Sequence, residues 1–130
     1  MIRNPNEILE KEKKIRILIA GYPGIGKSTL ALSAPNPLHI DVDFGIDRIE
    51  PRYRKPFIQP QSYDEILEDL IPSKLKDFDT LVFDTGGKLI SLMSLWAIKK
   101  DPKYGQRDGS LSLKGYGFVG KEFVRLMDYC

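Results

Sequence analysis

The sequence contains almost no cysteine and no long hydrophobic run. One of its 130 residues is cysteine, Cys130, which excludes an internal disulfide and a cysteine zinc site. A chain without disulfides fits a reducing compartment, so we expect a cytoplasmic location. The longest apolar tract covers residues 89–98. It is too short to cross a bilayer and predicts a buried helix, so we expect no membrane partner.

The net charge is also small, and residues 1–14 do not have the pattern of a targeting signal. The 20 Lys and Arg residues and 18 Asp and Glu residues leave a net charge of +2, which alone does not indicate a nucleic-acid partner. Residues 1–14 are polar and charged without an apolar core, so we do not expect them to form a signal peptide. The composition is ordinary for one globular domain. We therefore predict a charged N-terminal segment, 1–14, and one domain, 15–130.

The chain alternates between strand and helix patterns. Apolar runs predict strands at 15–21, 38–43, 56–59 and 80–84. Helices are expected at 26–34, 62–78, 87–100 and 118–130, with a polar loop at 101–117. Ser62 and Glu65 form a capping box at the start of the second helix. This alternation predicts an α/β fold with helices on both faces of a parallel sheet, and ligands at the C-terminal strand ends.

A glycine-rich stretch, GYPGIGKST, follows the first expected strand. Its spacing matches the phosphate-binding loop. Glycines let several backbone N–H groups approach one phosphate, and the helix N-terminus adds a positive dipole end. We expect Lys27 to bridge the β- and γ-phosphates, Ser28 to bind Mg²⁺, and Thr29 to lie near the α-phosphate. The expected nucleotide-binding residues are Gly21, Tyr22, Pro23, Gly24, Ile25, Gly26, Lys27, Ser28 and Thr29.

Two acids complete the predicted site. Asp84 ends the strand TLVFD, where a magnesium-ordering acid belongs in such folds, although a strand-capping role is the alternative. Thr85 stands where many ATPases place a water-activating glutamate, so a catalytic base must come from elsewhere. Asp43, at the end of the second strand, is our candidate for that base. The alternative is that Asp43 begins the turn into Phe44 and Gly45.

The stretches ILIAGYPGIGKSTLALSAPNPLHIDVDFGIDRI and SYDEILEDL…FDTLVFDT together resemble the RecA-like P-loop ATPases. The pattern is most similar to the phage-encoded ATP-binding (AAA-like) proteins of recombination and single-strand annealing. The resemblance implies a three-layer P-loop NTPase fold, ATP and Mg²⁺ as cofactors, Lys27 and Asp43 as catalytic residues, and Ser28 and Asp84 as metal ligands. It also implies assembly into a homo-oligomer.

Two departures from that group matter. Residue 43 is usually glutamate there, and the shorter Asp43 predicts slow hydrolysis, because a misplacement of about 1 Å can cost about a hundredfold in rate. In that group a later strand also separates the phosphate-loop strand from the strand bearing Asp84. Nothing strand-like follows residue 84 here. We therefore expect residues 15–130 to be the N-terminal part of such a domain. A second chain filling the gap, or a different strand order, are the alternatives.

The expected loop at 101–117 interleaves basic, aromatic and glycine residues, namely Lys103, Tyr104, Arg107, Lys114 and Tyr116. Such patterns can bind single-stranded DNA, and a solvated loop is the alternative.

The leading hypothesis is a Mg²⁺-dependent ATPase acting in phage DNA recombination or annealing inside a bacterial host cell. The first alternative is a nucleotide-binding module with little or no hydrolysis. The second is a small P-loop kinase, whose arginine-rich lid would be sought at Arg48, Arg52 and Arg54. The sequence has no guanine-reading NKxD stretch, which favours ATP over GTP.

Overall fold

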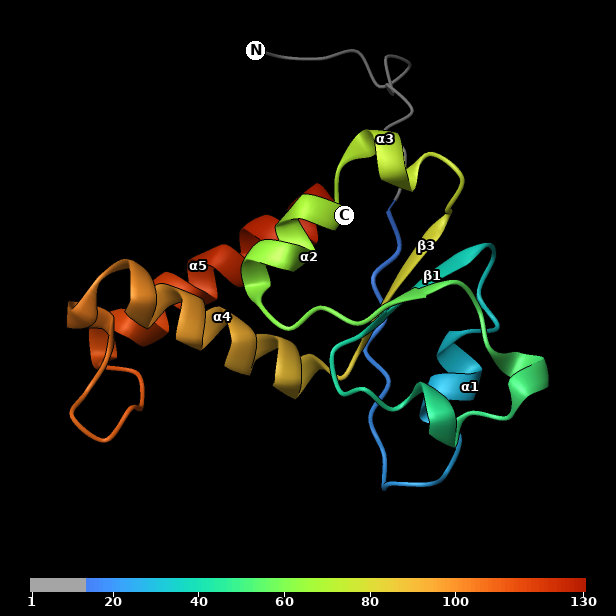
Figure 1. The fold of residues 1–130 in the computed structure, drawn as a ribbon, viewed down its shortest axis with the longest axis horizontal. Coiled ribbons are helices and arrows are strands. Elements are labelled where there is room, and N and C mark those ends of the chain that lie inside the picture. The colour runs from blue at the N-terminus through green and yellow to red at the C-terminus, as the bar shows by residue number, and fades with distance from the viewer. Residues whose placement is uncertain (1–13) are drawn as a thin grey trace, which may run out of the picture.

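A computed structural model describes residues 14–130. Figure 1 shows a small sheet with helices α2, α4 and α5 on one side and α1 on the other. The strands are β1 (Pro37–Asp41), β2 (Phe57–Ile58) and β3 (Thr80–Asp84). The helices are α1 (Lys27–Ala31), α2 (Tyr63–Asp69), α3 (Pro72–Leu75), α4 (Gly86–Lys100) and α5 (Leu113–Tyr129), with 3-10 turns η1 (Ile46–Arg48), η2 (Pro51–Tyr53) and η3 (Pro102–Tyr104). The expected α/β fold with a parallel sheet is confirmed.

The sheet has the order β2-β1-β3, with β1 parallel to both neighbours. All five residues of β1 are buried, as expected for a strand with a partner on each side. The register pairs Leu38 with Leu81 and Asp41 with Asp84. The C-terminal ends of β1 and β3 therefore meet at one edge, where the acids of both strands come together.

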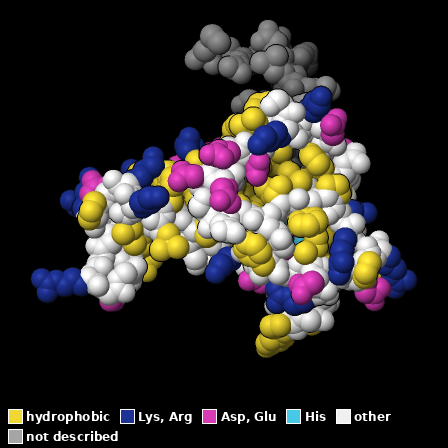
Figure 2. All heavy atoms as spheres, viewed as in Figure 1, with side chains coloured by type: hydrophobic (Ala, Val, Ile, Leu, Met, Phe, Trp, Pro, Cys, Tyr) yellow, Lys and Arg dark blue, Asp and Glu magenta, His cyan; other side chains and the backbone are white. Residues whose placement is uncertain are grey.

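The strand expected at 15–21 does not form, and that prediction is wrong. Residues 14–22 have no strand structure, and Ile15, Ile17 and Leu18 have exposed fractions of 83%, 78% and 91%. The physical reason is the lack of a neighbour. Within residues 14–130, β3 pairs only with β1, and this segment is not paired with the free edge of β3, so its backbone has no strand neighbour. Figure 2 shows hydrophobic side chains gathered over the strands and below α3.

The helix expected at 62–78 is present but divided. Ser62 caps α2 by accepting a hydrogen bond from the backbone N–H of Glu65, as the capping-box pattern predicts. The helix stops at Asp69, and α3 starts at Pro72, a residue that is favoured at a helix start and disfavoured in a helix interior. The cap was therefore predicted correctly, and the helix length was overestimated.

Helix α4 contains the apolar tract at 89–98 and supplies much of the core, as expected. Leu89, Met93 and Ala97 have exposed fractions of 1% or less. Their spacing of four residues places them on one face, against the sheet and the other helices. In the part of the chain that the structure describes, no helix is long and apolar enough to span a membrane.

The loop expected at 101–117 is shorter and more ordered than predicted, because α5 starts at Leu113 and not at 118. Ser112 caps α5 by accepting a hydrogen bond from the N–H of Gly115, and its own N–H donates to the carbonyl of Tyr104 at 2.9 Å. A Cβ on Gly115 would collide with that same carbonyl. Glycine here lets η3 pack directly against α5, and it does not mark a flexible loop.

Candidate functional site

The glycine-rich stretch at 21–29 forms a turn that leads into α1. Gly24 and Gly26 have φ angles of 80° and 94°, in the left-handed region that other residues avoid. Gly26 occupies the N-cap position, and Lys27 is the first residue of the helix. This part of the motif therefore needs its glycines for backbone conformation. The turn leads directly into α1 at Lys27, as the motif in the sequence predicts.

The side chain of Lys27 folds back over this loop. Its Nζ donates hydrogen bonds to the carbonyl oxygens of Gly21 at 2.8 Å and Tyr22 at 2.7 Å. The ammonium group is thus held at the mouth of the turn, where an anionic ligand would compete with the two carbonyls. Tyr22 and Ile25 expose 84% and 64% of their surface, so the tip of the loop is open.

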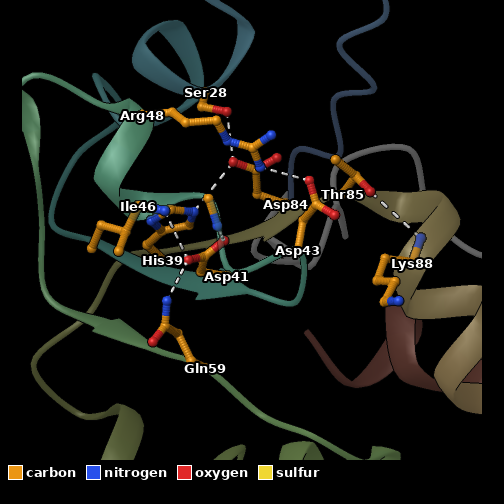
Figure 3. A network of polar contacts seen from close by, with 11 residues as sticks. Ser28, His39, Asp41, Asp43, Ile46, Arg48, Gln59, Asp84, Thr85 and Lys88 are labelled. Atoms are coloured by element: carbon orange, nitrogen blue, oxygen red, sulfur yellow. Dashed lines mark hydrogen bonds and ion pairs between the residues drawn. The ribbon is translucent and has the colours of Figure 1, made fainter. Parts of the chain in front are cut away.

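Ser28 and Asp84 meet although 56 positions separate them in the chain. The Ser28 hydroxyl donates a hydrogen bond to Oδ2 of Asp84 at 2.6 Å (Figure 3). The hydrogen bond from His39 and that from Ser28 hold the pKa of Asp84 below its ordinary value, although partial burial acts in the opposite direction. The carboxylate is therefore ionised at neutral pH.

These two side chains suit Mg²⁺, which prefers hard oxygen ligands such as hydroxyl and carboxylate groups. Ser28 lies in the first turn of α1, next to Lys27, so a cation held here would lie close to the phosphates of a nucleotide in the loop. The donor set thus fits the metal predicted from the sequence.

Asp43 lies just beyond the C-terminal end of β1, beside the end of β3. Its backbone N–H donates to the carbonyl of Asp84 at 3.2 Å, and its carboxylate accepts a hydrogen bond from Arg48 at 2.8 Å. The side chains of Asp43 and Arg48 are 42% and 68% exposed. A hollow of about 440 Å³ opens beside Asp43, between the end of β1 and α4. The candidate base is therefore exposed next to Asp84 and carries an arginine partner.

The turn after β1 is held by Asp41. Its carboxylate is fully buried and accepts hydrogen bonds from the N–H groups of Gly45 at 2.9 Å and Ile46 at 3.0 Å, and from Gln59 at 2.8 Å. An acid that organises a turn through backbone N–H groups is a common device. The alternative drawn from the sequence was that Asp43 begins this turn. The hydrogen bonds show instead that Asp41 holds the turn (Figure 3).

His39 was not predicted as a site residue. It is fully buried, and its Nε2 lies 3.3 Å from the same Oδ2 of Asp84 that Ser28 contacts. A signal existed in the sequence, because residues 39 and 41 alternate along a strand and must share a face. That face looks toward Ser28, whereas Leu38 and Ile40 point into the main core.

Two other expected features, Thr85 and Thr29, lie beside this centre, and a third lies away from it. Thr85 caps α4 by accepting from the N–H of Lys88 at 3.5 Å, which gives it a structural role. Thr29 lies in α1, as its position in the motif requires. The basic and aromatic residues of η3 and the start of α5 lie at the opposite end of α4, away from the loop (Figure 1). The fold therefore does not bring that cluster to the centre formed by Ser28 and Asp84.

Comparison with known proteins agrees with this geometry. A family model described as an AAA domain matches residues 13–130. The chain is 32% identical over 78 residues to the replication factor C small subunit of Methanococcus maripaludis, in two strains. This stretch is 60% of the chain and 22% of that subunit, so the chain spans about a fifth of the length of the curated relatives it matches. No solved structure matches the chain. The phosphate loop, the contact between Ser28 and Asp84 and the family match lead to one conclusion: the chain belongs to the AAA domain family of P-loop ATPases.

Proposed function

We propose that this protein binds ATP together with Mg²⁺ and hydrolyses it slowly. The observation that carries the proposal is the 2.6 Å hydrogen bond between Ser28 and Asp84, directly beside the lysine-bearing loop. A loop for phosphates and two oxygen ligands for a cation are thus combined in one place. Membership of the AAA domain family supports nucleotide as the ligand.

Each site residue has a distinct role in this proposal. The loop N–H groups and Lys27 bind the phosphate oxygens, and Lys27 exchanges its carbonyl partners for them. Ser28 and Asp84 hold Mg²⁺, which when bound neutralises charge on the β- and γ-phosphates. Asp43 orients the attacking water and accepts its proton. The buried turn at Asp41 fixes the backbone from which Asp43 projects.

The ion pair between Asp43 and Arg48 favours slow turnover. Arg48 donates to the Asp43 carboxylate at 2.8 Å, so Asp43 must release Arg48 before that oxygen can accept a hydrogen bond from the attacking water. The shorter side chain of aspartate acts in the same direction. A module that binds ATP and hydrolyses almost none is therefore the second candidate function, and this ion pair is the observation that favours it.

The strand order supports the RecA-like variant of the fold. β3 pairs with β1, and within the described residues 14–130 its other edge faces no strand. The segment at 15–21 is likewise unpaired and exposes its apolar side chains. We propose that a further strand fits between this segment and β3, supplied by additional sequence or by a second chain. This arrangement does not support a kinase-type order, in which β3 would pair directly with the phosphate-loop segment.

A role with DNA, in phage recombination or annealing in the host cytoplasm, is the finer part of the proposal. The name of the similar protein, replication factor C small subunit, supports a DNA-related process. So does a hollow of about 320 Å³ lined by Lys103, Tyr104, Lys114, Gly117, Phe118 and Lys121. The ring of Tyr104 stacks on Phe118 at 4.4 Å. Lysines around an apolar aromatic floor suit single-stranded DNA, whose backbone is anionic and whose bases stack.

Phosphate release with and without single-stranded DNA tests this function. We expect slow Mg²⁺-dependent release from the wild type, and none above background from the Lys27→Ala variant. DNA affinity should fall steeply as salt rises, and exchange of Lys103, Lys114 and Lys121 for glutamine should reduce that dependence. Transfer of labelled phosphate to a nucleoside monophosphate would instead identify a kinase. ATP binding without phosphate release would identify the non-hydrolysing module.

A further inference from the structure

The proposed function assigns no role to His39. It is the only histidine in the chain, and it is fully buried on the central strand. A buried polar group loses its hydration, and proteins compensate for that loss with hydrogen bonds. The contacts of His39 therefore indicate what the side chain does.

These contacts lead to Asp84. The Nε2 atom of His39 lies 3.3 Å from Oδ2 of Asp84, while Nδ1 has no hydrogen-bond partner among residues 14–130. Asp41 is near enough to form a cluster with both residues. Its carboxylate, however, already accepts two backbone N–H groups and the amide of Gln59. The hydrogen bond of His39 is thus directed at Asp84.

The same contacts fix where the imidazole carries its proton. An ionised carboxylate only accepts hydrogen bonds, so the nitrogen that faces Oδ2 of Asp84 must be the donor. A proton on Nδ1 would be buried without an acceptor, which proteins avoid. His39 therefore holds its proton on Nε2 and donates it to Asp84.

We propose that His39 is a positioning residue for the Mg²⁺ site. His39 and Ser28 both donate to Oδ2 of Asp84, and two donors from different elements hold the carboxylate in one orientation. Groups that orient a metal ligand in this way strengthen metal binding without touching the metal. This inference rests on the proposed function, because it assumes that Asp84 serves a cation.

Metal affinity is the direct test. With a saturating non-hydrolysable ATP analogue, Mn²⁺ binding is measured by electron paramagnetic resonance on the wild type, His39→Leu and His39→Gln. The leucine variant removes the donor, and we expect its Mn²⁺ affinity to fall about 10- to 100-fold. The glutamine variant keeps an N–H donor and should lose less than about tenfold. Affinity for the analogue in EDTA should remain that of the wild type in both variants.

Gln59→Leu is the matched control, since it removes a donor to Asp41 and none to Asp84. Its Mn²⁺ affinity should equal that of the wild type. Unchanged Mn²⁺ affinity in His39→Leu would overturn the inference. An equal loss of analogue affinity in EDTA would also overturn it, because His39 would then support the fold and not the metal.

A second measurement holds even if His39→Leu does not fold. Nitrogen NMR of the wild type reports the tautomer without ambiguity, because the chain has one histidine. We expect a protonated Nε2 and a bare Nδ1, with the Nε2 signal shifted in Asp84→Asn. The opposite tautomer, or no shift, would contradict the contact. If the wild type binds no nucleotide, the proposed function fails, whereas the NMR result still decides whether His39 donates to Asp84.

Discussion

β1 and β3 are neighbouring parallel strands of equal length, each with an acid at its C-terminal end, yet they differ in how deeply they are buried. Every residue of β1 is buried, whereas every residue of β3 is only partly buried. β1 has a strand on both sides, and within the described residues β3 has one. β1 behaves as the interior of the sheet. β3 has the sequence of an interior strand and the surroundings of an edge, and this difference motivates the further strand proposed above.

The largest expected effect compares Leu38 and Leu81, which face each other across the two strands. Leu38 is 6% exposed, so Leu38→Ala should lower the free energy of unfolding by about 2–5 kcal/mol. Leu81 is only partly buried, so Leu81→Ala should cost about half as much or less. Urea denaturation of both variants measures the difference. Equal losses would contradict the edge position of β3 in this chain and would show that a second chain already covers it in solution.

Asp43, just beyond the end of β1, should control the rate of ATP hydrolysis and not the affinity for ATP. Replacing Asp43 with asparagine should lower the ATP turnover number by about 100-fold while ATP affinity stays the same, because a general base acts in the chemical step. The measurement is steady-state phosphate release together with equilibrium binding. An unchanged turnover number would make Asp43 a turn residue. Arg48→Ala is the companion variant and should raise turnover, because it frees the Asp43 carboxylate.

Asp41 should matter for stability and not directly for chemistry. Asp41→Asn keeps the shape and weakens the acceptor for two backbone N–H groups and Gln59, so it should cost about 1–3 kcal/mol of unfolding free energy. Thermal and urea unfolding measure that loss. A variant as stable as the wild type would show that the turn after β1 does not depend on this buried carboxylate.

The smallest expected effect is a pH dependence that belongs to β3. The pKa of Asp84 in the folded protein lies below its ordinary value of 3.8, chiefly through the His39 hydrogen bond. A lowered pKa stabilises the folded state above the ordinary pKa, and this contribution is lost as pH falls toward the lowered value. Unfolding free energy should therefore fall with acidification below about pH 5. The slope should be shallower in Asp84→Asn, and an unchanged slope would assign the effect to other acids.

The sequence predicted the features that depend on local chemistry. The phosphate loop leads into α1 at Lys27, Ser62 caps α2, and the strand ending at Asp84 lies where its apolar run predicted. Motif spacing and capping depend on residues within a few positions of one another, which a sequence displays directly. The meeting of Ser28 and Asp84 followed from a general property of parallel sheets.

The features that the sequence missed depend on distant neighbours. An apolar run such as 15–21 becomes a strand only if it pairs with a neighbouring strand, and this segment is not paired with the free edge of β3. Helix α5 begins earlier than its apolar stripe suggests, because Ser112 and Gly115 contact η3. The roles of His39 and Asp41 were hidden because each depends on the strand or turn that lies beside it in space.

In the proposed function, the loop at Lys27 and the pair of Ser28 and Asp84 form one site for Mg²⁺ and ATP. Isothermal titration of ATP in Mg²⁺ and in EDTA tests it most directly on the wild type, Lys27→Ala and Asp84→Asn. The wild type should bind more tightly with Mg²⁺, Asp84→Asn should lose that advantage, and Lys27→Ala should bind weakly in both conditions. Equal binding by all three proteins, or no binding by the wild type, would contradict the account.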